Sequence, residues 1–415
     1  MSISPSIRRM DRLLSAGLAT TWVLVLLFAF YLSVRPWPDI LLHIDFSSYW
    51  MAASLLKEGA GASMFDMGRQ YAFEIALRHQ VGTTDFIRSD TGYNPYPNLP
   101  PLALLYVPLT VLPMPWAYAV CWIVNFAASL SAVAISLRGY PLGRTVAILM
   151  LSFVAVTTSL FEGQPYGLFL LDLAAALLLF RSGRPFWGGV LLGLFWLKPQ
   201  YAAVFPLVFL LKGRWREIAG MAISGVIVAG ASVLLVGVDG LVAYVRLLEG
   251  IGGFRYQWVD PAAMINWRSL LLNLWPAIPS EVGSALVVGL GAATILVSLM
   301  VWRGEWDVSS PRFQFQVLVT IAATIIASPH SHIHGAIFLL PPLALALGES
   351  RGQAWLSRWW VALLLVGCAL SFAIWPFGAP RWIMMPYLVA AMGTLIVRCR
   401  SVAYPQRVPL ARVAQ

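Results

Sequence analysis

The stretch LATTWVLVLLFAFYLSV, residues 18–34, decides the fold class, because it is uncharged, mostly apolar and long enough to cross a bilayer. Three arginines precede it within the first twelve residues. The run is longer than the roughly 7–15 apolar residues of a signal peptide, and no small-x-small cleavage site follows it before Arg35-Pro36. We therefore predict a first transmembrane helix that enters the membrane from the cytoplasm.

Apolar runs of this kind recur along the whole chain. Of its 415 residues, 59% are hydrophobic and 11% are charged, and the mean hydropathy is +0.76. A soluble globular protein carries roughly 25% charged residues, so the composition indicates an all-α polytopic membrane protein. Cys121, Cys368 and Cys399 lie in or beside apolar runs without metal-ligand spacing, which favours core positions over a disulfide framework or a zinc site.

The net charge of +10 comes from small basic groups between the apolar runs. This grouping is typical of cytoplasmic loops, and no basic stripe with interleaved aromatics is present, so we expect no nucleic acid partner. The runs that place these groups on one side of the membrane lie near residues 13–34, 116–137, 145–160, 167–180, 186–197, 201–211, 217–236, 283–302, 315–328, 335–348, 359–375 and 382–398.

This assignment predicts 11 or 12 transmembrane helices. The uncertainty in the count comes from 186–197 and 201–211, which form either two half-length helices that meet at Lys198-Pro199 or one kinked helix. We expect a single domain over residues 1–400, followed by a cytoplasmic tail at 401–415.

Two large loops are expected on the outer, periplasmic face, at residues 35–98 and 238–281. In the first loop a helical face is formed by Phe46, Tyr49, Trp50, Ala53 and Leu56. This pattern predicts amphipathic helices that lie in the plane of the interface. The apolar run at 99–113 is too short to cross a core of roughly 30 Å at about 1.5 Å per residue, so we interpret it as a re-entrant or interfacial element.

Polar residues that suggest chemistry collect on this outer side. The segment HIDFSSYWMAASLLKEG, residues 43–59, places the carboxylate of Asp45 just beyond the first helix. Ionisable groups in or beside a membrane are costly and indicate function. The other candidates lie in turns or in the second loop: Gln164, Lys198, Gln200, Arg268, His330 and His332. A single carboxylate suits a general base, and cationic or imidazole groups suit a departing phosphate.

Each candidate also has a structural interpretation. Asp45 fits an N-cap of a helix that begins at the next residue. Lys198 fits a snorkelling side chain, although its position before a proline at a helix break favours anion binding. Asp172, inside an apolar run, fits a hydrogen bond within the bundle. Three histidines alternate along residues 330–334 with no carboxylate nearby, which is a weak pattern for a metal site.

The absence of nucleotide-binding motifs indicates which kind of molecule carries the departing phosphate. Neither G-x-x-x-x-G-K-[ST] nor G-x-G-x-x-G occurs, so the chain lacks the loops that cradle nucleotide phosphates. A lipid-linked phosphosugar fits both this absence and an outer-face site.

The chain resembles glycosyltransferase family 87 over residues 13 to about 348. The matching motifs are Asp45-Phe46-x-x-Tyr49-Trp50-x-Ala52-Ala53, Gly59, Tyr96-Pro97-x-x-Pro100-Pro101-Leu102, Pro108-Leu109, Leu112-Pro113, Gly163-Gln164, Gly188-Gly189-x-x-x-Gly193-x-x-x-x-Lys198-Pro199-Gln200 and Ser328-Pro329-His330-Ser331-His332. The members are bacterial multi-span enzymes that use polyprenyl-phosphate-linked sugars. Their characterised type is the polyprenyl-phosphate-mannose-dependent mannosyltransferase.

The resemblance implies a C-type glycosyltransferase fold in the bacterial inner membrane, with a cytoplasmic N-terminus and an active site that faces the periplasm. It implies transfer of a sugar, most simply mannose, from a polyprenyl-phosphate donor to a glycan or glycolipid acceptor of the cell envelope. It also implies that Asp45 is the catalytic base. The residues expected to hold the donor phosphate and sugar are Lys198, His330, His332, Arg268, Gln164 and Gln200. We expect Tyr49 and Tyr96, from the aromatic outer loop, to contact the acceptor.

The expected reaction is one displacement, in which Asp45 deprotonates the acceptor hydroxyl and polyprenyl phosphate leaves with inversion. Retention through a covalent intermediate would require a second carboxylate as nucleophile. No acidic residue neighbours Asp45 in the sequence, so we expect neither a metal ion nor another cofactor. The alternatives are an arabinose or other pentose donor, a lipid-linked sugar transporter or flippase, and a structural assembly factor. A transporter often contains inverted repeats, and none is visible.

Overall fold

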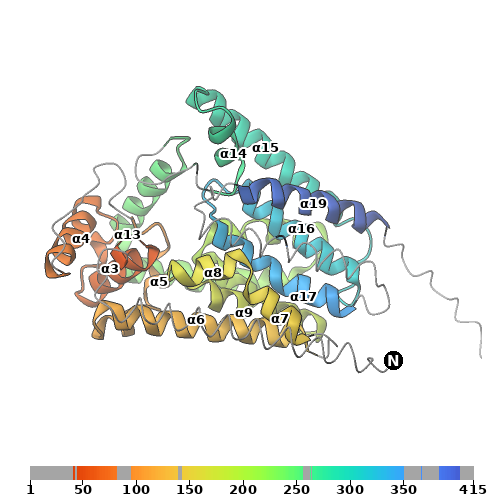
Figure 1. Cartoon of the computed structure of the whole chain (residues 1–415), viewed down its shortest axis with the longest axis horizontal. Coiled ribbons are helices and arrows are strands. Elements are labelled where there is room, and N and C mark those ends of the chain that lie inside the picture. The colour runs from red at the N-terminus through yellow and green to blue at the C-terminus, as the bar shows by residue number, and fades with distance from the viewer. Residues whose placement is uncertain are drawn as a thin grey trace, which may run out of the picture.

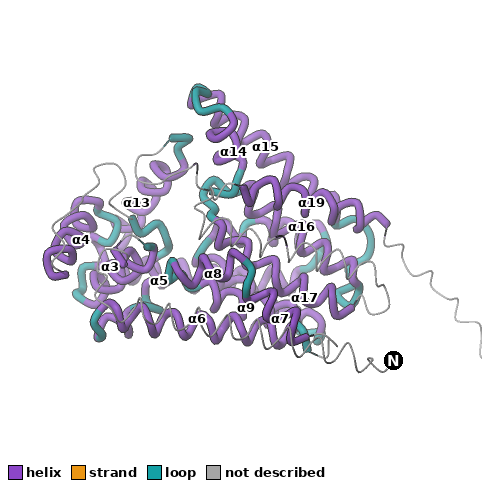
Figure 2. The backbone as a smooth tube through the Cα atoms, viewed as in Figure 1, coloured by secondary structure: helices purple, strands orange, loops and turns teal. Residues whose placement is uncertain are grey.

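The computed structural model describes residues 41–42, 44–81, 95–138, 143–255, 262, 264–349, 366 and 383–401. Every regular element within these ranges is a helix (Figure 2), which confirms the predicted all-α class. The predicted first span lies outside the described residues, as do nearly all of the span at 359–375, residues 256–261 of the second loop, and the tail beyond residue 401.

Three described helices have the length and apolar composition to cross a bilayer: α6 (Met114–Ser136), α13 (Trp215–Gly252) and α15 (Ser280–Val301). Shorter helices pack around them. In chain order these are α7 (Gly143–Leu151), α8 (Val154–Phe161), α9 (Tyr166–Arg181), α10 (Pro185–Gly193), η3 (Leu194–Leu197), α11 (Pro199–Ala202), α12 (Val204–Leu211), α16 (Pro311–Ala327), η5 (Ile333–Leu339), α17 (Leu340–Glu349) and α19 (Met384–Ser401).

Several predicted spans are interrupted. The run at 145–160 forms α7 and α8, which meet at Ser152 and Phe153, and the half-length pieces around Lys198 are separate helical segments on either side of it. The run at 99–113 contains only α5 (Pro100–Ala103) and η2 (Val107–Val111), in agreement with a non-spanning element. Prolines explain the short pieces around Lys198 and in the run at 99–113, because a proline removes a backbone donor and disfavours helix in the residue before it.

The elements of the first outer loop gather at one end of the bundle, at the left of Figure 1. They are α3 (Asp45–Lys57), η1 (Gly61–Ser63) and α4 (Met67–Val81). The sequence predicts an amphipathic helix with one buried face for α3. In the structure both faces are largely buried, because Ser47 and Ser48 are covered together with the apolar residues. The helix packs against α5 and η2. It is therefore enclosed by protein and held in a fixed position.

Glycines set the close packing of the bundle. A Cβ added at Gly189 of α10 would lie 2.3 Å from the backbone oxygen of Glu217, and one at Gly220 of α13 would lie 2.2 Å from that of Phe186. Small residues allow membrane helices to approach closely. A second feature of α13 is its bend at Gly237, whose φ of +70° lies in the left-handed region that favours glycine. One large buried cluster extends from Leu41 to Leu395.

Candidate active site

Asp45 is the first residue of α3 and is half-buried. The N-cap of α3 is Ile44, whose side chain makes no capping hydrogen bond, so the N-cap interpretation of Asp45 is wrong. A different carboxylate performs that role. Oε2 of Glu162 accepts a hydrogen bond from the backbone N–H of Asp45 at 3.2 Å. An acidic side chain thus lies beside Asp45 in space, although none neighbours it in the sequence.

The side-chain amide of Gln164 is the centre of the polar cluster. Its Nε2 donates a hydrogen bond to Oδ2 of Asp45 and lies 3.3 Å from Nε2 of His334. Its Oε1 accepts hydrogen bonds from the hydroxyl of Tyr49 at 3.0 Å and from Nζ of Lys198 at 2.9 Å. One buried amide therefore joins the carboxylate to the ammonium group.

Lys198 lies in the turn between two apolar segments and is buried. Its Nζ lies 4.7 Å from the ring centroid of Tyr166 and 5.6 Å from that of Tyr49, in the range of cation–π contacts. Burial lowers the pKa of Lys198 to about 7, and the nearby carboxylate of Asp45 opposes this shift. The ammonium group is therefore near the point of losing its proton at neutral pH, and an anion bound beside it would stabilise its charged form.

The three histidines form a row next to Gln164. The ring centroids of His334 and His332 are 5.6 Å apart, and those of His332 and His330 are 4.9 Å apart. Burial, together with the nearby His332 and Lys198, lowers the pKa of His330 well below its ordinary value. The His330 ring is thus neutral at pH 7 and suited to hydrogen bonding. No group of residues that could hold a metal ion is found within the described ranges.

Arg268, in α14 (Trp267–Leu274), is buried next to the segment 328–332 that carries His330 and His332. Its guanidinium donates hydrogen bonds to the backbone oxygens of Phe254 at 3.0 Å, Ile251 at 2.8 Å and Pro329 at 3.4 Å. Burial lowers the pKa of Arg268 to about 10. Its Nη2 is buried without a hydrogen-bond partner among the described residues. The arginine therefore links the end of α13 and Phe254 to Pro329, next to His330.

The remaining predicted residues have different surroundings. Tyr96 is fully buried and donates to the backbone oxygen of Leu99 at 3.1 Å, and its ring meets that of Tyr49 edge-on at 5.5 Å. Gln200 is half-buried in α11, and the hydrogen bonds described around Gln164 do not include it. Tyr49 is thus bonded directly to Gln164, and Tyr96 packs against the ring of Tyr49.

Three contributors were absent from the predicted site residues: Glu162, Tyr166 and His334. Glu162-Gly163-Gln164 is visible in the sequence as a polar break between two apolar runs, but its pairing with Asp45, 117 residues away, depends on the fold. Tyr166 begins α9 and supports both Lys198 and His334, whose ring centroid lies 4.7 Å from its own. A tyrosine at a membrane interface is common, so its sequence position alone carries no specific signal.

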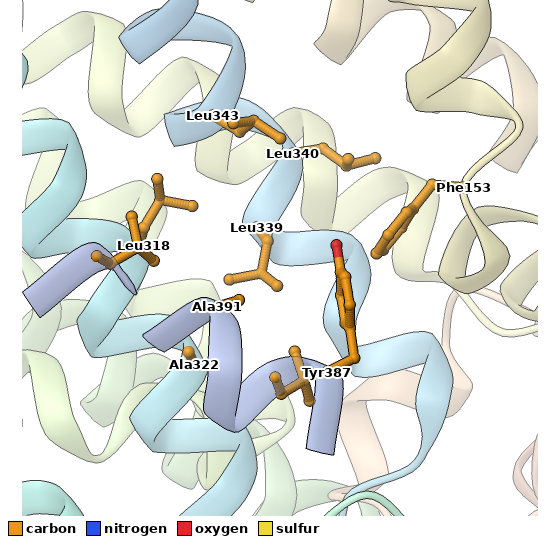
Figure 3. A pocket seen from close by; sticks show the side chains of 10 residues that line it. Phe153, Leu318, Ala322, Leu339, Leu340, Leu343, Tyr387 and Ala391 are labelled. Carbon is orange, nitrogen blue, oxygen red and sulfur yellow. The ribbon is translucent and has the colours of Figure 1, made fainter. Parts of the chain in front are cut away.

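A small, partly open apolar pocket lies at the other end of η5 from His334 (Figure 3). It is formed by α16, α17, α19 and the residue before α8. Its lining consists of Phe153, Leu318, Ala322, Leu339, Leu340, Leu343, Tyr387, Leu388, Ala391 and Leu395. One short helix thus connects the polar cluster to a strongly apolar space.

Comparison with known proteins gives a family match and a named relative. Residues 96–329 match the model of glycosyltransferase family 87. A relative from Mycolicibacterium smegmatis, a polyprenol-phosphate-mannose-dependent alpha-(1-2)-phosphatidylinositol pentamannoside mannosyltransferase, is 28% identical over 354 residues, which cover 81% of this chain and 85% of the relative. No solved structure matches. Asp45 and the three histidines lie outside the residues that the family model matches.

Proposed function

Because the chain belongs to glycosyltransferase family 87, we propose that it transfers mannose from polyprenyl-phosphate-mannose to a glycolipid or glycan acceptor, with Asp45 as the general base. The coarser part of this description, a multi-pass membrane glycosyltransferase that takes a lipid-linked sugar, follows from the family and from the named relative. The sugar, the base and the acceptor are the proposal.

The observation that carries the mechanism is the shared amide of Gln164. The carboxylate of Asp45 and the ammonium of Lys198 are hydrogen-bonded to opposite ends of one side chain. Transfer needs a base on the acceptor side and a positive charge on the phosphate side, held a short distance apart. A rigid amide between the two groups provides this separation.

The proposed step is a single displacement. Asp45 removes the proton of an acceptor hydroxyl, and the oxygen attacks the anomeric carbon of the donor sugar. The bond from this carbon to the phosphate oxygen breaks, and polyprenyl phosphate leaves with the electron pair. Lys198, Arg268 and the row of histidines stabilise the charge on the phosphate, while Tyr49 and Tyr96 border the acceptor side. The anomeric configuration inverts.

The pocket beyond η5 supports a lipid-linked donor. A polyprenyl phosphate has an anionic head and a long apolar tail. His334, at the start of η5, belongs to the polar cluster, and Leu339, at its end, lines the apolar pocket. An isoprenoid chain is compatible with such a surface, because its apolar carbons make the same van der Waals contacts there as with lipid tails. The anionic head and the apolar tail of the donor would thus contact opposite ends of the same short helix, η5.

We also propose that the cluster faces the periplasm and that the N-terminus is cytoplasmic. The basic groups between the apolar runs support this orientation. Polyprenyl-phosphate arabinose is the second candidate donor, because the described contacts involve the phosphate and the base and do not distinguish a hexose from a pentose.

The proposal is tested with membranes that contain the chain and a radiolabelled donor. With polyprenyl-phosphate-mannose we expect label to appear in the glycolipid or glycan fraction, and with polyprenyl-phosphate-arabinose we expect none. Label from the arabinose donor alone would replace mannose by a pentose. Transfer from neither donor, in membranes that contain abundant folded protein, would contradict the enzyme proposal and favour a lipid-linked sugar transporter.

A further inference from the structure

We propose that the turn Glu162-Gly163-Gln164, here called the 162–164 turn, is a positioning device that sets both the place and the orientation of Asp45. This inference rests on the proposed function, in which Asp45 is the base. The turn joins α8 to α9 and is far from α3 in the sequence. Its three residues contact the start of α3 in three different ways.

Glu162 holds the backbone of α3. Its carboxylate accepts the N–H of Asp45 at 3.2 Å, and its backbone oxygen accepts the N–H of Phe46 at 2.8 Å. The first N–H groups of a helix have no partner inside the helix. Ile44 at the N-cap has no side-chain acceptor for them. Glu162 therefore supplies the cap from outside, and its negative charge is favourable at a helix N-terminus.

Gln164 binds the side chain of Asp45, whose backbone is held by Glu162. Its Nε2 donates to Oδ2 of Asp45. Since residues 162 and 164 bind the backbone and the carboxylate of the same residue, a rigid turn fixes both the position and the rotation of the carboxylate. A displacement of the turn would move Asp45 relative to Lys198, which is bound to the other end of the Gln164 amide.

Gly163 explains why the turn fits so closely. Its φ is +65°, and a Cβ at this position would lie 2.7 Å from Cβ of Phe46, whose side chain is fully buried. Its backbone oxygen accepts a hydrogen bond from the hydroxyl of Tyr106 at 2.9 Å. A larger residue at position 163 would clash with Phe46 of α3, and the hydrogen bond from Tyr106 would oppose a shift of the turn away from it. Glycine is therefore required for contact as well as for conformation.

The first test compares Gly163→Ala with Gly183→Ala. Gly183 has a similar φ of +70°, and a Cβ added there meets nothing within 4 Å. Both variants carry the same backbone strain, but only Gly163→Ala pushes against Phe46. We expect kcat of Gly163→Ala to fall about 100-fold, the cost of a misplacement of about 1 Å, with little change in KM for the donor. Gly183→Ala should transfer like the wild type, and an equal loss in both variants would overturn the proposal.

The second test separates the cap from general destabilisation. Glu162→Ala removes the acceptor for the Asp45 N–H, whereas Glu162→Gln keeps an acceptor oxygen. We expect Glu162→Ala to lower kcat at least about tenfold and Glu162→Gln to recover most of it, because the acceptor geometry is retained. The exposed Glu58→Ala at the other end of α3 is the control and should behave like the wild type. Equal activity of Glu162→Ala and Glu58→Ala would contradict the proposal.

A third measurement does not require sugar transfer. The purified full-length chain, shown to be folded by size-exclusion chromatography, is treated with a carbodiimide, and modification of Asp45 is followed by mass spectrometry. We expect faster modification in Gly163→Ala than in the wild type, and an unchanged rate in Gly183→Ala. Equal rates in the two variants would overturn the positioning role. If the rates differ and the wild type transfers no sugar, the proposed function fails and the positioning role stands.

Discussion

The amide of Gln164 connects the two groups that transfer requires. It donates to Asp45 and accepts from Lys198 and Tyr49, so its orientation is fixed by chemically distinct partners at each end. An amide satisfied in this way is costly to rotate in a buried site, because any rotation would leave a donor or acceptor unpaired. The separation of the carboxylate and the ammonium is therefore built into the resting protein.

The titration of Lys198 gives a measurable pH dependence. Its pKa is lowered to about 7 by burial, so the fraction of free protein with a charged amine falls as the pH rises above 7. Only the charged form pairs with the donor phosphate. We expect KM for the donor to be constant below pH 7 and to rise by up to about tenfold per pH unit above it.

Lys198→Arg provides the matched comparison for this dependence, because arginine stays protonated throughout the range. It should show a flatter dependence of KM on pH, while Lys57→Arg at the exposed end of α3 should retain that of the wild type. An unchanged slope in Lys198→Arg would show that another group titrates.

Sequence reasoning found several residues of the cluster and missed others for a physical reason. Lys198 and Gln164 are polar residues at breaks in apolar runs, where function is the default expectation. Glu162 sits in the same kind of break, but its contact is with a backbone N–H that any residue supplies. Such a contact does not depend on the partner's side chain, so the sequence carries no signal for it. Only the structure shows that Glu162 and Asp45 are paired.

Individual elements show where periodicity is informative and where it fails. The spans α6 and α15 lie close to the predicted runs, because a membrane helix needs about twenty apolar residues. Helix α13 follows the predicted run at 217–236 only as far as its kink at Gly237 and then continues to Gly252, so the first part of the predicted loop at 238–281 is helical. The burial of α3 could not be predicted, since its polar face is covered by protein instead of water. The break between α7 and α8 at Ser152 and Phe153 involves neither proline nor glycine, so the sequence likewise gives no signal for it.

The α10–α13 contact predicts a large effect from a small substitution. Gly220→Ala places a methyl group 2.2 Å from the backbone oxygen of Phe186, so the two helices must separate. We expect a loss of about 1–3 kcal/mol, as for other overpacked interiors, measured by unfolding of the purified protein in detergent. Gly230→Ala in the same helix meets nothing within 4 Å. It should be neutral or stabilising by up to about 1 kcal/mol, and an equal loss in both variants would contradict the packing argument.

The molecule as a whole places its polar cluster at one end of an apolar bundle. The buried cluster that extends from Leu41 to Leu395 supports the proposal that residues 1–400 form one domain. The fold class followed from composition and from the parity of the basic groups. The number of spans stays a prediction of 11 or 12, because the predicted first span and most of the span at 359–375 lie outside the described residues.

The proposed orientation predicts opposite accessibility for two exposed positions. In a background in which the three native cysteines are replaced, Glu58→Cys, in the same outer loop as Asp45, should react with a membrane-impermeant maleimide in intact cells. Ser182→Cys, in the turn between α9 and α10, should react only after permeabilisation. The reverse pattern would place the site on the cytoplasmic side and would remove the support for a periplasmic acceptor.

The most direct test of the central claim is sugar transfer from polyprenyl-phosphate-mannose by Asp45→Asn. Asparagine has a similar shape but cannot accept the proton of the acceptor hydroxyl, so we expect transfer to fall at least about 100-fold, the contribution of a general base. Asp66→Asn, an exposed carboxylate of the same outer loop, is the control and should match the wild type at equal abundance. Transfer by Asp45→Asn at the wild-type rate would show that Asp45 is not the base and would contradict the mechanism.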